Sequence, residues 1–147
     1  MISDKKRNSY LAEWKNELLK EAKRKKMDLS KDLSEEVPCK PGVYAVFEKS
    51  KLVYVGETGN ILKRIKDIRS TYNHQLRRNI GKHYKMSGYR RVNSKTKFPA
   101  KTEKQINDFF ENKFKFSYLV LKLGRKELEE SIYDKHKPKY NKKGRRK

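Results

Sequence analysis

The chain has 147 residues, 40 of them Lys or Arg against 18 Asp or Glu, for a formal net charge of +22. This length predicts one domain with a single core, and the charge exceeds what solubility requires, which indicates a polyanionic partner, nucleic acid first. A single cysteine, Cys39, and the lack of any apolar run near transmembrane length argue against a disulfide, a thiolate zinc site and a membrane span.

Residues 1–40 are predicted to form an N-terminal helix and a connector. Between residues 3 and 26, the apolar residues Leu11, Trp14 and Leu18 recur at spacings of three and four, which gives a helix one apolar face. The first residues are charged and lack the apolar segment that directs secretion, so we expect a cytoplasmic protein. From residue 27 the helical period is lost, as is typical of a connector.

Two runs of β-favouring residues follow, Val43–Phe47 and Leu52–Val55, with a polar segment between them. The length of that polar segment fits a hairpin turn, so we predict two antiparallel strands. Because side chains alternate along a strand, a hairpin can bring the Tyr44 and Tyr54 hydroxyls to the same side.

Helices are predicted on both sides of a third strand. Asn60 can cap a helix that begins at Ile61, and further helices are predicted over residues 74–84, 101–113 and 125–135. A loop is expected over 85–100, and the third strand over 114–123, in the middle or at the edge of the sheet. The predicted class is therefore α/β (α+β), a small three-stranded mixed antiparallel sheet flanked by helices.

An acid-free segment, residues 68–102, carries ten Lys and Arg side chains. Gly81, Gly88 and Pro99 interrupt it, which disfavours the long amphipathic helix that membrane binding requires. We therefore expect it to contact nucleic acid and not a membrane. The predicted nucleic-acid contacts, from this segment and the preceding helix, are Lys63, Arg77, Arg78, Lys82, Arg90 and Arg91. A basic tail, residues 142–147, is expected to add electrostatic attraction.

A set of chemically suitable residues is spread along the chain. Gly-Val-Tyr at 42–44 is followed, after nine residues, by Tyr-Val-Gly at 54–56, and Arg64 lies ten residues beyond Tyr54. Glu129 precedes Asn141 by twelve residues. Tyrosine hydroxyls can position or deprotonate water, a guanidinium can hold a phosphate oxygen, and a carboxylate can hold a divalent metal. The combination indicates phosphodiester hydrolysis.

This pattern resembles the GIY-YIG nuclease family, and among its members the compact restriction-type enzymes. The resemblance covers residues 41–141 and implies a nuclease domain over that range, with a basic insertion at about 69–101. Valine replaces isoleucine in both tripeptides, which keeps the β-branched packing. Gly42 and Gly56 would be scaffold residues of the motif.

The resemblance also implies a mechanism. Tyr44 would activate the attacking water, Tyr54 would orient the water or the scissile phosphate, and Arg64 would stabilise the developing phosphorane charge. Glu129 would bind one Mg²⁺ (or Mn²⁺) per active site, and Asn141 would support the site through hydrogen bonds. A lone carboxylate with substrate oxygens and waters suits Mg²⁺ and argues against a two-metal mechanism.

Some members of the family place a histidine one helical turn after the arginine, where this chain has Ile68. His74 is the candidate for that role, although the three histidines show no ligand spacing, which favours the alternative of an exposed or helix-capping histidine. DNA is the expected partner, and RNA stays open. Cleavage of both strands would need two successive nicks or a dimer. The resemblance favours a restriction or other defence role.

Two other functions stay open from the sequence. The first is a nucleic-acid-binding protein that keeps the nuclease scaffold and cleaves nothing; the presence of all five key side chains argues against it. The second is a ribosomal or other RNA-associated basic protein, for which the two tripeptides and the spacing of Glu129 and Asn141 would be coincidental.

Overall fold

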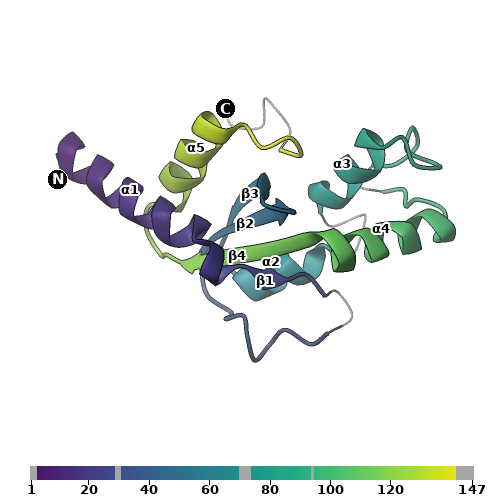
Figure 1. The fold of residues 1–147 in the computed structure, drawn as a ribbon, viewed down its shortest axis with the longest axis horizontal. Coiled ribbons are helices and arrows are strands. Elements are labelled where there is room, and N and C mark those ends of the chain that lie inside the picture. Colours follow the sequence, from purple (N-terminus) through teal and green to yellow (C-terminus); the bar gives the residue numbers. More distant parts are fainter. Residues whose placement is uncertain (1–2, 29–30, 70–73, 94, 142–147) are drawn as a thin grey trace.

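An antiparallel sheet forms the centre of the computed structural model, which describes residues 3–28, 31–69, 74–93 and 95–141 (Figure 1). Its four strands lie in the order β1-β4-β2-β3. They are β1 (Lys25–Lys26), β2 (Gly42–Glu48), β3 (Lys51–Thr58) and β4 (Phe114–Val120). The predicted α+β class is confirmed, with one more strand than expected. The basic tail at 142–147 lies outside the described residues.

The additional strand, β1, comes from the segment predicted to end the first helix. Ser3 is the N-cap of helix α1 (Asp4–Leu19), which ends well before residue 26. A single 3₁₀ turn, Glu21–Lys23, redirects the chain, and β1 then pairs with β4. The predicted helix over 3–26 is therefore too long at its C-terminal end, because the sheet edge offers hydrogen bonds to this backbone.

Helices cover both faces of the sheet. They are α1 and α5 (Arg125–His136) on one face, and α2 (Ile61–Asp67), α3 (Gln75–His83) and α4 (Ala100–Lys113) on the other (Figure 1). As expected, Asn60 caps α2 by accepting a hydrogen bond from the Lys63 amide. No helix in the described part of the chain has the length and apolar character needed to cross a membrane.

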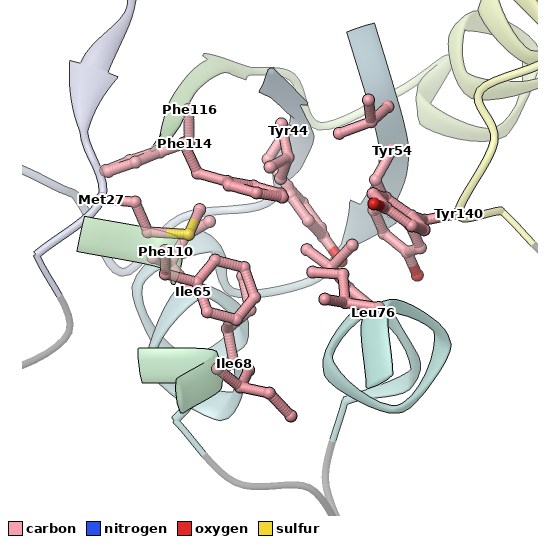
Figure 2. Packing of buried hydrophobic residues seen from close by; sticks show 14 of the residues in the cluster. Met27, Tyr44, Tyr54, Ile65, Ile68, Leu76, Phe110, Phe114, Phe116 and Tyr140 are labelled. Atoms are coloured by element: carbon pink, nitrogen blue, oxygen red, sulfur yellow. The ribbon is translucent and has the colours of Figure 1, made fainter. Parts of the chain in front are cut away.

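Successive side chains of β2 point to opposite faces of the sheet and join two separate hydrophobic clusters. Val43, Ala45 and Phe47 face α1 and α5, where they pack with Leu128 and Ile132. Tyr44 and Val46 face the opposite side and join the larger cluster, which includes Ile65, Leu76, Phe110 and Phe114 (Figure 2). The larger cluster therefore places the first motif tyrosine against α2 and α3.

Helices α3 and α4 are joined by an ion pair whose arginine is buried. The Arg77 side chain is 1% exposed, and its guanidinium lies 2.7 Å from the Glu103 carboxylate. It also donates to the Asn107 side chain at 2.7 Å and to the Glu103 carbonyl oxygen at 2.9 Å. The prediction that Arg77 contacts nucleic acid is therefore wrong, because this guanidinium is buried and used within the protein.

Candidate active site

The hairpin brings the two motif tyrosines together. Tyr44 lies opposite Gly56, and Val46 lies opposite Tyr54, so these four side-chain positions share one face of the sheet. The register shifts between Val46 and Phe47. The Tyr44 and Tyr54 rings stack with centroids 6.1 Å apart, and both are buried. Figure 2 shows both rings on the side that faces α3.

Gly56 leaves the space that the Tyr44 ring occupies. A Cβ atom at position 56 would lie 2.5 Å from the Tyr44 hydroxyl oxygen and 2.6 Å from Cζ. Gly42 has a different role, because a Cβ there would overlap the Leu119 carbonyl and the Ile61 side chain. The two motif glycines therefore have physical functions: one admits the tyrosine, and the other lets β2 pack closely against β4 and α2.

His74 contacts Tyr44 directly from the N-terminus of α3. Its Nδ1 accepts a hydrogen bond from the Leu76 backbone N–H at 3.0 Å, which caps the helix. Because an amide N–H can only donate, Nδ1 carries no proton and the neutral ring holds its proton on Nε2. That nitrogen lies 2.8 Å from the Tyr44 oxygen, so His74 donates to Tyr44. Ile68, at the position where the resemblance places a histidine in some relatives, is buried in the core.

Arg64 reaches the same hydroxyl from α2. Burial raises the pKa of Tyr44 well above its usual value, and Tyr54 raises it further, whereas the charge of Arg64 and its hydrogen bond to Tyr44 lower it. Tyr44 is thus a neutral phenol near neutral pH, surrounded by donors that favour its anion. Asp67, three residues on, lies 3.4 Å from the Arg64 guanidinium. We did not predict this partner, although the helical spacing could have indicated it.

Glu129 and Asn141 lie along the outer edge of β3. The Glu129 carboxylate accepts a hydrogen bond from the Glu57 backbone N–H at 2.9 Å. The Asn141 amide accepts from Val55 N at 2.9 Å and donates to Val55 O at 2.8 Å. Glu129 is therefore bound to the backbone of Glu57, the residue that follows Gly56. Asn141 binds the C-terminal segment to β3, the strand that carries Tyr54.

The residues available for a metal are few. In the part of the chain that the structure describes, no three or more His, Cys, Asp or Glu side chains gather as a metal cluster. Glu129 is half-buried, and the neighbouring Glu57 carboxylate is engaged by Arg125 at 3.1 Å. A single carboxylate is compatible with Mg²⁺, which takes most of its ligands from water and substrate oxygens.

The remaining predicted nucleic-acid contacts lie mostly at the surface. Lys82, Arg90 and Arg91 are exposed, and Arg78 is half-buried. Lys63 is exposed on α2 one residue before Arg64, with its ammonium 3.5 Å from Asp67. Their roles in binding stay predictions, as do the catalytic roles of the six residues described above.

The sequence matches the model of a known protein family. A family model described as the GIY-YIG catalytic domain matches residues 13–147. No curated protein matches the chain at a significant level.

Solved structures that resemble the chain include the GIY-YIG N-terminal endonuclease domain of UvrC from Thermotoga maritima bound to magnesium. It is 20% identical, with a TM-score of 0.41, and the alignment covers 73% of this chain and 89% of that chain. A point mutant of the same Thermotoga maritima domain is 15% identical, with a TM-score of 0.39 and coverage of 74% and 89%. Because the family match spans most of the sequence and includes both tripeptides, the chain belongs to the GIY-YIG family and is an endonuclease of the GIY-YIG type.

Proposed function

We propose that this protein is a metal-dependent DNA endonuclease in which Tyr44 activates the attacking water. The observation that carries the proposal is the buried Tyr44 hydroxyl, where the His74 N–H, the Arg64 guanidinium and the Tyr54 hydroxyl converge. A tyrosine that served only as core packing would not need a histidine and an arginine at its oxygen. The net charge of +22 supports a nucleic-acid substrate.

The chain's own residues would act as follows. Deprotonated Tyr44 takes a proton from the water that attacks phosphorus, and His74 and Arg64 stabilise the phenolate by donating to its oxygen. Arg64 is also placed to hold an oxygen of the phosphate as negative charge develops. Tyr54, stacked on Tyr44, orients the water or the phosphate. Asn141 keeps β3 in place through its two bonds to Val55.

Glu129 is the residue that would hold the metal ion. A divalent cation, Mg²⁺ or Mn²⁺, supplies charge that polarises the phosphate and stabilises the leaving 3′-oxygen. The bond from the Glu57 amide orients the Glu129 carboxylate before any ion arrives. Such support by a neighbouring donor is typical of metal ligands in proteins.

Exchange of Glu129 for Gln tests the metal assignment. Glu129→Gln keeps the shape of the side chain and an acceptor oxygen for the Glu57 amide, but removes the charge that holds a cation. We expect Mg²⁺-dependent nicking of supercoiled plasmid to fall at least about 100-fold, with DNA binding in chelator retained. Glu130→Gln is the matched control, because Glu130 is exposed on the same helix. The Glu130→Gln variant should cleave plasmid at the wild-type rate. Full activity of Glu129→Gln would contradict the assignment.

Exchange of Gly56 for Ala tests the position of Tyr44. The added methyl would lie 2.5 Å from the Tyr44 hydroxyl, so the ring has to move. A displacement of about 1 Å costs on the order of 100-fold in rate, and we expect plasmid cleavage to fall by this amount. Gly59→Ala is the control, because nothing lies within 4 Å of a Cβ at position 59. Equal cleavage rates for the two variants would mean that the observed placement of Tyr44 is not the active one.

Restriction or another defence role is the finer part of the proposal. It is supported by the acid-free segment, residues 68–102, which places ten Lys and Arg side chains within the nuclease domain itself. Digestion of plasmid and phage DNA into discrete fragments is the expected result. Random nicking without preferred positions would contradict a restriction role and leave the nuclease proposal intact.

A further inference from the structure

The basic insertion borders an open cleft that is lined by none of the six candidate active-site residues. It has a volume of about 710 Å³ and is formed by the chain between α3 and the start of α4. The residues that line it are Lys85, Met86, Ser87, Gly88, Tyr89, Arg90, Arg91, Thr96, Lys97, Phe98 and Pro99. This volume is within the range of about 300–1,000 Å³ that is usual for small-ligand sites.

Hydrogen bonds hold the walls of the cleft in place. The Phe98 amide donates to the Glu103 carboxylate at 3.1 Å, which is the same carboxylate that pairs with Arg77. The Thr102 hydroxyl donates to the Ser87 carbonyl at 3.0 Å. A Cβ at Gly88, where φ is +86°, would lie 2.5 Å from the Pro99 ring, so this turn packs closely on the start of α4. The cleft is thus fixed to the start of α4, and the ion pair between Glu103 and Arg77 links it to α3.

Its polar groups favour an anion. Lys85, Arg90, Arg91 and Lys97 contribute to the lining, and no acidic residue does. The Arg90 guanidinium is oriented by Tyr89, since its Nε donates to the Tyr89 hydroxyl at 3.1 Å. The cations therefore suit a phosphate group.

The apolar side chains of the cleft indicate a ligand that has an apolar part as well as a phosphate. Met86, Tyr89, Phe98 and Pro99 share the lining with the cations, and Phe98 is buried in the main cluster. A ligand that matches both the cations and the apolar side chains has a flat apolar part joined to an anion. A nucleotide has this composition. A base inside a duplex is stacked between its neighbours, so only an unpaired base could enter such a cleft.

We propose that the insertion cleft binds one unpaired nucleotide of the DNA substrate, with its phosphate at Arg90 and Arg91 and its base against the apolar lining. This inference rests on the proposed nucleic-acid substrate and names a class of target: DNA with a looped-out or single-stranded nucleotide. The cleft would then select the DNA structure, while the tyrosine site carries out the cleavage.

The test compares three labelled duplexes by fluorescence anisotropy in chelator: one fully paired, one with a single unpaired thymine, and one with an abasic residue at that position. We expect wild type to bind the unpaired thymine at least about fivefold more tightly than either other duplex, which is the lower range for stacking of one base. Arg90→Ala combined with Arg91→Ala should remove this preference.

Lys5→Ala combined with Lys6→Ala is the matched control. It removes the same charge from exposed positions on α1, at the end of the molecule opposite α3 and α4 (Figure 1), and should keep the preference. Equal affinity of wild type for the three duplexes, or an unchanged preference in the Arg90 and Arg91 variant, would overturn the inference. Because binding is measured without metal, these outcomes are independent of cleavage: a preference without any cleavage would contradict the proposed function alone.

Discussion

Replacing Tyr44 by Phe is expected to lower the rate of plasmid cleavage at least about 100-fold, the usual contribution of a general base. The substitution removes only the hydroxyl at which His74 and Arg64 converge. The ring keeps its place in the core, so circular dichroism and DNA binding in chelator should match the wild type. The measurement is the initial rate of nicking with Mg²⁺ at matched enzyme concentration.

Tyr118→Phe is the control for this exchange. Tyr118 lies opposite Tyr44 on β4, and its hydroxyl bonds to the Glu36 carbonyl at 2.7 Å, so its loss should leave the rate unchanged. The pH dependence gives a second readout. Because burial raises the pKa of Tyr44, the phenolate is the minor form near neutral pH, and the wild-type rate should rise with pH. A Tyr44→Phe enzyme with the wild-type rate and pH profile would refute the role of Tyr44.

Replacing Arg77 by Met is expected to give the largest loss of stability. The exchange leaves the Glu103 carboxylate without its cation between α3 and α4. Breaking a buried ion pair by removing one partner costs about 3–5 kcal/mol. Because the Glu103 side chain is 19% exposed, we expect the lower end of this range, which corresponds to a fall in Tm of about 10 °C for a chain of this size. Thermal unfolding followed by circular dichroism measures it.

Lys104→Met is the matched control for Arg77. It removes one positive charge from an exposed position on α4, the helix that carries Glu103, and its Tm should stay close to that of the wild type. If the Arg77→Met protein kept the wild-type Tm but bound DNA more weakly, Arg77 would be a nucleic-acid contact. This result would contradict its role in stabilising the packing of α3 against α4.

The β-hairpin and its tyrosines could be predicted because local signals determine them. Alternating β-branched residues and a polar turn indicated the strands, and Asn60 indicated the start of α2 through an interaction with Lys63 nearby in the chain. The pairing of Tyr44 with Gly56 could not be predicted, because it depends on the register shift between Val46 and Phe47. What the sequence could not show is that Gly56 admits the Tyr44 ring, because this depends on the observed rotamer.

The parts that could not be predicted depend on contacts between distant segments. Arg77 was expected at the surface because its charge is one of many, and Glu103, 26 residues away, is what allows its burial. His74 was one of three histidines without ligand spacing, and its contact with Tyr44, 30 residues earlier, requires α3 to pack on the sheet. Likewise, β1 forms only because the edge of β4 accepts it.

The most direct measurement is the conversion of supercoiled plasmid to nicked and linear forms by the wild-type protein, with Mg²⁺ and with chelator, beside Tyr44→Phe. The proposed function predicts cleavage that requires Mg²⁺ and is lost in the variant. Equal cleavage by both proteins, or no cleavage of plasmid, branched DNA or single-stranded DNA by the wild type, would contradict the proposal that the Tyr44 hydroxyl activates water for phosphodiester hydrolysis.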